Sequence, residues 1–207
     1  MMLVNRTVSD ILAAFRSSAP TPGGGSASAL AGAIGASLLA MVAALPKSRA
    51  TTEEDAQRLQ AAGDRCTALS ATLESLIDRD ASAYDLVMAA YKQPKTTDEE
   101  KTARSAAIQF AMREAIDAPL AVMRACAAAA EQGVVVASLG NPSASSDVRV
   151  GLELLNAGLR GAKLNVEINE SSVKDAEHVG RVKNDVTEFE RAIAHETAAA
   201  IAAFDRA

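Results

Sequence analysis

The sequence predicts an all-α fold, a bundle of long, mostly antiparallel helices joined by short loops. Apolar residues recur in alternating steps of three and four along most of the chain, which places them on one face of a helix. Proline, glycine and capping residues divide the chain into a few long segments. The valine run at 134–136 would suit a strand, but it has no partner run, so we interpret it as helix.

Composition agrees with one globular domain covering residues 1–207. The chain is 49% hydrophobic and 23% charged, and its aromatic content of 3% excludes a core built on large aromatic anchors. The net charge is -5, and lysines and arginines do not gather in any block. Because sequence-independent nucleic-acid binding rests on a basic surface, we expect no nucleic-acid partner.

A short first helix is expected to carry Val8, Ile11, Leu12 and Phe15 on one face, with Ser9 or Thr7 as its cap, and a loop over residues 20–26 follows it. No charged residue occurs between residues 17 and 46. The segment Ala27–Leu45 is long enough to span a membrane. It consists of Ala, Gly and Ser more than Leu and Ile, so we expect a helix packed among other helices and no membrane association. Its large side chains form one stripe and its small ones a second: Leu30, Ile34, Leu38, Met41 and Leu45; Gly32, Ala36 and Ala40.

Four further helices are expected. The first follows a cap at residues 51–52 and ends before Pro94, and the second begins at residues 97–100, with Pro119 predicted to kink it. The third follows the stop at Gly140, and the last begins near Asp175. Their apolar seams are Leu59, Ala62, Cys66, Leu69, Leu73 and Leu76; Ile108, Met112, Ala115 or Ile116, Pro119, Met123, Cys126 and Ala130; Val148, Leu152, Leu155, Leu159, Ala162 and Val166; Val179, Val182, Val186, Phe189, Ile193 and Ala200.

The two cysteines and two histidines do not form a metal-binding pattern. Cys66 and Cys126 each lie in a helical pattern without a CxxC partner, and His178 and His195 lack the spacing of zinc ligands. We therefore expect buried, reduced thiols and no metal. Residues 1–16 do not resemble a secretory signal, which favours a cytoplasmic protein.

Two features are candidates for a functional site. The loop Pro22–Ser26 leads directly into a helix, so its bare glycine backbone and the unpaired N–H groups of the helix start suit a planar or anionic ligand. A flexible turn explains the glycines equally well. Asp80 lies on the line of an apolar seam, where a carboxylate is costly unless it is paired or faces a cavity. A structural role and a functional role suit Asp80 equally.

Other polar residues are weaker candidates. Asp147 lies where a helix cap is expected, and capping alone accounts for it. Asn165 and Asn169 are one helical turn apart beside a seam, which suits buried amide contacts. Lys92 and Lys95 lie at a helix end, where they favour the helix dipole or hold the acidic tail of a ligand.

Five short motifs in this order resemble the cyclodeaminase/cyclohydrolase family, which includes the C-terminal domain of formimidoyltransferase-cyclodeaminase and stand-alone methenyltetrahydrofolate cyclohydrolases. The resemblance extends over nearly the whole chain, and the order of the motifs makes it specific. The motifs are Pro22-Gly23-Gly24-Gly25-Ser26, Arg79-Asp80-Ala81-x-Ala83-Tyr84, Ala90-Tyr91-Lys92-x-Pro94-Lys95, Gly140-Asn141-Pro142-x-Ala144-x-Ser146-Asp147-Val148, and Gly161-Ala162-x-x-Asn165-Val166-x-Ile168-Asn169.

The resemblance implies an all-helical homodimer that acts on a one-carbon derivative of tetrahydrofolate. It implies either hydrolysis of 5,10-methenyltetrahydrofolate to 10-formyltetrahydrofolate or deamination of 5-formimidoyltetrahydrofolate to 5,10-methenyltetrahydrofolate and ammonia. In both reactions a nucleophile attacks a cationic, amidine-like carbon, which a carboxylate stabilises without a metal or an organic cofactor. The stretch at residues 46–51 differs from the basic run with a tyrosine found in cyclohydrolases.

The resemblance also implies roles for particular residues. Asp80 and Asp147 are the expected catalytic carboxylates, with Asp147 at the border of the folate pocket. The residues expected to bind the substrate are Gly23, Gly24, Gly25, Ser26, Tyr84, Lys92, Asn141 and Asn165. The alternative is a non-catalytic folate-binding or scaffold protein of the same fold.

Overall fold

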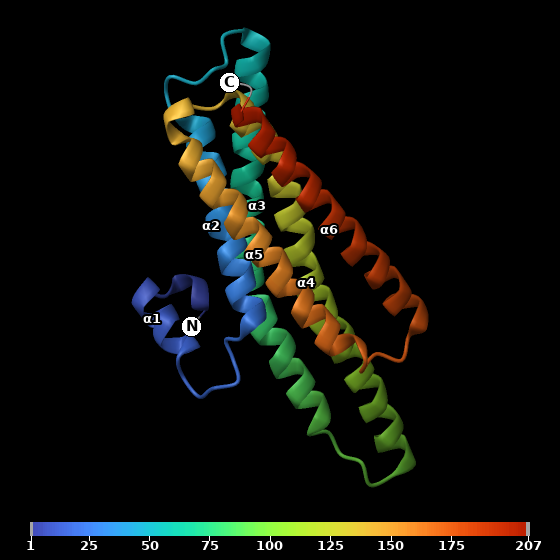
Figure 1. The fold of residues 1–207 in the computed structure, drawn as a ribbon. Helices are drawn as coiled ribbons and strands as arrows, with labels where there is room; N and C mark the ends of the chain where they lie inside the picture. The colour runs from blue at the N-terminus through green and yellow to red at the C-terminus, as the bar shows by residue number, and fades with distance from the viewer. Residues whose placement is uncertain (1, 206–207) are drawn as a thin grey trace.

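A computed structural model describes residues 2–205, and within that range it contains helices and no strands (Figure 1). The all-α fold predicted from the sequence is therefore confirmed, and the valine run at 134–136 lies inside a helix. The elements are η1 (Leu3–Asn5), α1 (Val8–Phe15), α2 (Gly24–Ala44), α3 (Glu53–Tyr91), α4 (Asp98–Leu139), η2 (Pro142–Ala144), α5 (Ser145–Glu170) and α6 (Ala176–Asp205).

The long helices pack side by side as a bundle. Helix α2 packs against α3 and α5, while α4 packs against α3, α5 and α6. Short connections such as residues 92–97 and 171–175 reverse the chain, so consecutive helices are antiparallel. The hairpin of α3 and α4 projects beyond the start of α2 and the end of α5, and α1 lies beside the bundle (Figure 1).

The helices begin where the sequence places capping residues. The Thr52 hydroxyl accepts a hydrogen bond from the Asp55 N–H at 3.1 Å. At the start of α4, Thr97 and Glu100 form a reciprocal capping box. Each cap satisfies N–H groups that have no partner inside the helix, and this fixes the point at which the helix begins.

The predicted seams of α3 and α5 form much of the core. All six seam residues of α3 from Leu59 to Leu76 are buried, as are all six of α5 from Val148 to Val166. Burial of these aliphatic side chains is the main force that holds the helices together, at about 1.5–3 kcal/mol for each large side chain. Both cysteines also belong to this core and are unpaired.

Helix α2 packs through its small side chains. A Cβ on Gly35 would lie 2.6 Å from the Gly151 carbonyl oxygen of α5, and one on Gly32 would lie 2.7 Å from the Cys126 sulfur. Such short distances show that the backbone of α2 directly contacts its neighbours, as the small stripe predicts. The large stripe is only partly covered, since Ile34 and Met41 are 45% and 42% exposed.

Two helices, α2 and α4, are long and apolar enough to cross a membrane, with mean hydropathies of 1.9 and 1.4. In the bundle, however, α2 packs against α3, α4 and α5, and α4 packs against four other helices. Their apolar character therefore serves the core of the bundle, and neither helix is a membrane span.

Candidate functional site

A cavity of about 270 Å³ opens where α2 begins, beside the C-terminal third of α3 and the end of α5. Helices α2, α3, α4 and α5 and the loop before α2 form its wall. The residues that line the cavity are Pro20, Thr21, Gly23, Gly24, Asp80, Ala83, Tyr84, Val87, Ala115, Asn165, Ile168 and Asn169.

Asp80 projects from α3 into this cavity and is tied to the first turn of α2. Its Oδ2 accepts hydrogen bonds from the Ser26 N–H at 2.9 Å and from the Ser26 hydroxyl at 3.1 Å. Burial raises the pKa of the Asp80 carboxyl, and the two hydrogen bonds from Ser26 offset part of that rise. A carboxyl with a raised pKa accepts and returns protons more readily near neutral pH than an exposed aspartate.

Gly25 leaves the space that the Asp80 carboxylate occupies. A Cβ at this position would overlap the carboxylate, and even the more distant oxygen, Oδ2, would be only 2.8 Å away. Gly24 differs, because a Cβ there would contact only the Asn165 amide, whose Nδ2 is the nearer atom at 3.4 Å. The glycine run therefore contributes two separate features. The backbone of Gly23 and Gly24 is exposed in the cavity wall, and the absence of a side chain at Gly25 leaves space for the Asp80 carboxylate.

Ser26 lies behind Asp80 and does not line the cavity. It is fully buried, and its hydroxyl oxygen is 2.8 Å from the Ile77 carbonyl oxygen as well as 3.1 Å from Asp80 Oδ2. A hydroxyl has one hydrogen. Ser26 can donate it to an ionised Asp80, or donate it to Ile77 while accepting the proton of a neutral Asp80. We therefore assign Ser26 to positioning Asp80, although the sequence suggested contact with the substrate.

Asn165 and Asn169 of α5 line the cavity with their amide side chains. The Asn165 Nδ2 donates to the Gly161 carbonyl at 2.8 Å, and the Asn169 Nδ2 donates to the carbonyls of Asn165 and Ala115 at 2.9 and 3.1 Å. These bonds use both hydrogens of the Asn169 Nδ2 but only one of the two on the Asn165 Nδ2. The two amide oxygens therefore remain as acceptors for a ligand, and one Asn165 N–H remains as a donor.

Three of the expected site residues lie away from this cavity. Asp147 and Asn165 both belong to α5, and at 1.5 Å per residue the helix separates them by about 27 Å. Asn141 lies near Asp147, and its amide is engaged within the protein, with the Pro46 carbonyl at 2.7 Å and the Ser143 N–H at 2.8 Å. Lys92 follows the last turn of α3 and is exposed. Within a single chain these three residues lie outside the cavity that Asp80 lines.

Several residues of the cavity wall were not predicted from the sequence, mainly Thr21, Val87 and Ala115. Helical spacing from Asp80 reveals one of them, since Ala83, Tyr84 and Val87 follow at three, four and seven residues and share its face. Ala115 was a possible seam position of its helix, which does not indicate a ligand site, and no signal marks Thr21. Both residues reach the site through the fold of the loop and the packing of α4. Within residues 2–205, no three His, Cys, Asp or Glu side chains gather as a metal site requires.

The family model described as Formiminotransferase-cyclodeaminase matches residues 7–188. The chain belongs to this family. A methenyltetrahydrofolate cyclohydrolase from Methylorubrum extorquens is 42% identical over 174 residues, which are 84% of each chain. The formimidoyltransferase-cyclodeaminase of Sus scrofa is 34% identical over 80% of this chain but only 31% of its own length. The predicted resemblance is thereby confirmed.

The fold of this cyclodeaminase family member is also that of a solved structure. The formiminotetrahydrofolate cyclodeaminase from Thermotoga maritima superposes with a TM-score of 0.85, covering 97% of this chain and 96% of that one. The sequence identity between the two is 23%, so this comparison shows a shared architecture. Nearly the whole chain takes part in it, including the helices that carry the cavity.

Proposed function

We propose that this protein, as a single domain, hydrolyses 5,10-methenyltetrahydrofolate to 10-formyltetrahydrofolate. The observation that carries the proposal is Asp80, a partly buried carboxylate held at the end of a cavity beside bare glycine backbone. Its negative charge suits the cationic methenyl carbon, which is planar and joins two nitrogens. The 42% identity to a cyclohydrolase of similar length supports hydrolysis over deamination.

In the proposed mechanism, Asp80 moves one proton. Water attacks the methenyl carbon, and the Asp80 carboxylate takes a proton from it while stabilising the positive charge. The carbon–N5 bond then breaks, and Asp80 returns its proton to N5. The remaining hydroxyl on the carbon loses its proton to solvent and becomes the formyl oxygen. The amide oxygens of Asn165 and Asn169 accept hydrogen bonds from the pterin N–H groups.

Deamination of 5-formimidoyltetrahydrofolate is the second candidate. It is favoured by the family model and by the named cyclodeaminases, and it uses the same carboxylate. Here N10 attacks the carbon of the protonated, cationic formimidoyl group, and Asp80 takes the N10 proton and passes it to the formimidoyl nitrogen. The bond between the carbon and that nitrogen then breaks, which releases ammonia and leaves the methenyl cation. The two reactions are distinguished by following the methenyltetrahydrofolate absorbance with purified protein. The absorbance falls in hydrolysis and appears from formimidoyltetrahydrofolate in deamination, while folate binding without either change indicates the non-catalytic alternative.

The Ser26→Ala variant tests whether Ser26 lowers the pKa of Asp80. The Ser26 hydroxyl lowers the pKa of Asp80 by donating to its charged form, so removal of the hydroxyl should raise that pKa further. The carboxylate form is then lost at a higher pH, and the acidic limb of the rate profile should move upward. Ser28→Ala is the matched control, because the Ser28 hydroxyl bonds to the Gly24 carbonyl instead. An unchanged pH profile in Ser26→Ala would contradict this role.

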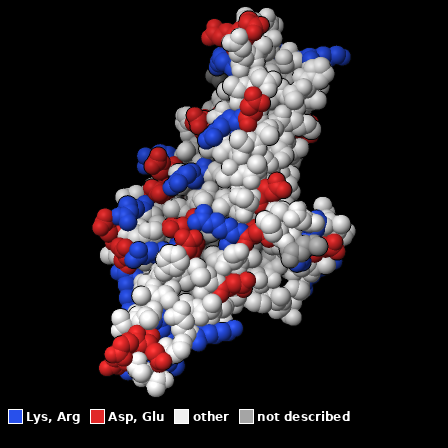
Figure 2. Space-filling model, turned by 180° about the vertical axis from the view of Figure 1, so that it is seen from behind, with Lys and Arg blue, Asp and Glu red and all other residues white. Residues whose placement is uncertain are grey.

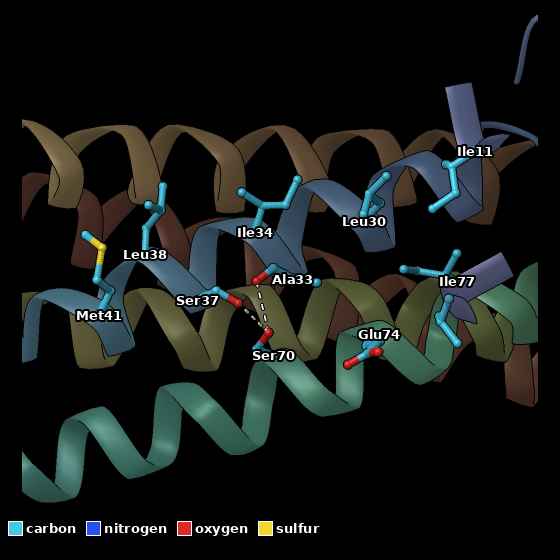
Figure 3. Close-up of a pocket in the computed structure, with 11 residues that line it drawn as sticks. Ile11, Leu30, Ala33, Ile34, Ser37, Leu38, Met41, Ser70, Glu74 and Ile77 are labelled. Atoms are coloured by element: carbon cyan, nitrogen blue, oxygen red, sulfur yellow. Dashed lines mark hydrogen bonds between the residues drawn. The ribbon is translucent and has the colours of Figure 1, made fainter. Parts of the chain in front are cut away.

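We further propose that the protein is a cytoplasmic homodimer joined through the exposed stripe of α2. A groove of about 500 Å³ runs between this stripe and α3, next to α1, and Figure 3 shows the large side chains of α2 standing along it. Seen from behind, an uncharged band extends above the lobe formed by the N-terminal segment (Figure 2). Large side chains and a groove on one face make that face self-complementary, as a two-fold contact requires. The groove is lined by Val4, Ile11, Leu30, Ala33, Ile34, Ser37, Leu38, Met41, Ser70, Glu74 and Ile77.

The double variant Ile34→Glu/Met41→Glu should convert the dimer to a monomer. Both side chains are more than 40% exposed in the single chain, so charges there cost little in folding but prevent burial against a second copy. Sedimentation velocity at micromolar concentration measures the change. Ile201→Glu on α6, at a residue outside the groove, is the control and should leave the dimer intact. A wild-type monomer, or an unaffected dimer in the double variant, would refute the interface.

A further inference from the structure

The Asn165 amide lies against the first turn of α2, in the wall of the cavity that contains Asp80. A Cβ on Gly24 would lie 3.4 Å from Asn165 Nδ2 and 3.8 Å from its Oδ1, so both polar atoms of the amide are close to the glycine loop. One hydrogen of Nδ2 and the oxygen Oδ1 are free to bind a ligand. A ligand in the cavity therefore meets a donor and an acceptor next to each other.

Two glycines of α5 bring Asn165 to this position. A Cβ on Gly158 would lie 2.8 Å from the Ser28 carbonyl oxygen, and one on Gly161 would overlap the Ser28 hydroxyl. The two helices approach this closely because α5 has no side chain at either position. Gly158, Gly161 and Asn165 are three and four residues apart and share one face of α5, so the contact of the glycines with α2 also fixes the distance of Asn165 from the glycine loop.

The Gly161 carbonyl determines which end of the Asn165 amide is the donor. Nδ2 donates a hydrogen bond to this carbonyl at 2.8 Å. If the amide turned over, Oδ1 would take the place of Nδ2, and two acceptors would face each other where a hydrogen bond had been. The order in which the amide presents its donor and its acceptor to the cavity is therefore fixed.

Asn169 adds an acceptor to this wall and no donor. Its Nδ2 uses both hydrogens within the protein, on the carbonyls of Asn165 and Ala115 at 2.9 and 3.1 Å, and this leaves Oδ1 for a ligand. Among the described residues that line the cavity, Asp80 is the only acid and there is no lysine or arginine. Away from Asp80, neutral hydrogen bonds therefore decide which ring the cavity accepts.

We propose that Asn165 selects the 4-oxopterin ring by pairing with its lactam edge, where N3–H lies next to the C4 carbonyl. This inference rests on the proposed function for the presence of a pterin in the cavity. The free Asn165 N–H donates to the C4 oxygen, and Oδ1 accepts from N3–H. Asn169 Oδ1 accepts from the neighbouring 2-amino group. Because C4 and N5 are attached to the same ring carbon, pairing at this edge also fixes the reacting carbon relative to Asp80.

The same fixed amide rejects 4-aminopterins. In these rings C4 carries an amino donor and N3 is an acceptor, so each group meets a like group on Asn165. The ring restores the pairing only by turning over, which directs its reacting side away from Asp80. In the productive orientation the polar groups of the ring and of Asn165 are left without partners, and this weakens binding.

Folic acid and aminopterin are the matched probes, because they differ only in the oxygen or amino group at C4 and neither carries the reacting carbon. Calorimetry at neutral pH, where the lactam keeps its proton and the aminopterin ring is uncharged, should show that the wild type binds folic acid at least about tenfold more tightly. Asn165→Asp should abolish this preference, because each ring then makes one matched and one mismatched contact. Asn184→Asp adds the same charge at an exposed position on α6 and should retain the preference.

Equal binding of the two probes by the wild type, or tighter binding of aminopterin, would overturn the proposal. Asn165→Leu, which keeps the size of the side chain and removes both polar atoms, is a second variant, and a preference retained in it would overturn the proposal as well. The binding assay needs no turnover. A protein that prefers folic acid but neither hydrolyses nor forms methenyltetrahydrofolate would retain the role of Asn165 while refuting the proposed reaction. An active protein that binds both probes equally would retain the reaction while refuting the role of Asn165.

Discussion

The Asp80→Asn variant should lose activity by roughly a hundredfold or more, the usual scale for a group that transfers a proton in the transition state. Asparagine keeps the size of the side chain, and its amide oxygen can still accept the Ser26 N–H, but it has no charge and cannot take up a proton. Steady-state turnover of methenyltetrahydrofolate, followed by its absorbance, measures the effect. Affinity for a folate product should change far less than turnover.

Thermal unfolding separates this result from simple misfolding. Burial raises the pKa of Asp80 in the folded protein, so the charged form is less favourable folded than unfolded. Stability from this group therefore falls as the pH rises through the range in which the carboxyl ionises. At neutral pH, Asp80→Asn should melt at the same temperature as the wild type or above it. Asp85→Asn, at an exposed position on the same helix, is the control. Full activity in Asp80→Asn would contradict the catalytic assignment.

The second large effect is expected from Gly25→Ala. The added methyl group would occupy the position of the Asp80 carboxylate, which must then turn away from Ser26. A displacement of about 1 Å at a catalytic group can reduce the rate by roughly a hundredfold. The kcat should therefore fall nearly as far as in Asp80→Asn, and circular dichroism should still report a folded helical protein, since alanine favours helix.

Two comparisons make the Gly25 prediction specific. Gly24→Ala places its methyl group 3.4 Å from Asn165 Nδ2, an ordinary contact, and should retain most of the activity. The double variant Gly25→Ala/Asp80→Asn should be no slower than Asp80→Asn alone, because both changes remove the same carboxylate function. Multiplied losses in the double variant would show that Gly25 acts on the reaction independently of Asp80.

Much of the fold follows from the sequence because packed helices have apolar residues and capping residues at characteristic spacings within one segment. The seam of α3 is visible as Leu59, Ala62 and Cys66, and the start of α4 is visible as the Thr97–Glu100 capping box. These signals depend on neighbouring residues within one helix. The all-α bundle and the approximate bounds of its long helices could therefore be predicted from the sequence alone.

The face that α2 turns to its neighbours was only partly predictable. Hydrophobicity alone favours burial of the large side chains, but Ile34 and Met41 remain exposed while Gly32, Gly35 and Ala36 pack. The reason is that backbones can touch only through small residues. The attraction gained over a close contact between α2 and α5 outweighs the exposure of a few larger side chains.

The candidate site was predictable in part for a different reason. Asp80 stands out because a carboxylate interrupts an apolar seam, and Gly25 lies in a recognisable loop. Sequence motifs do not reveal at which end of a helix bundle their residues meet. Asp147 and Asn141 were therefore expected beside Asp80, although a single chain places them at the opposite end of α5.

The burial of Cys66 and Cys126 makes this chain well suited to spectroscopic labelling. Both side chains are fully buried, and burial raises the pKa of each thiol to about 12, so almost no reactive thiolate exists at neutral pH. Maleimide reagents should leave the folded wild type unmodified. A cysteine introduced on the exposed face of α1 would then accept a dye or spin label with no need to replace the native thiols. Labels on α1 would then report the distance between the two copies in the proposed dimer, and the core would not need to be changed.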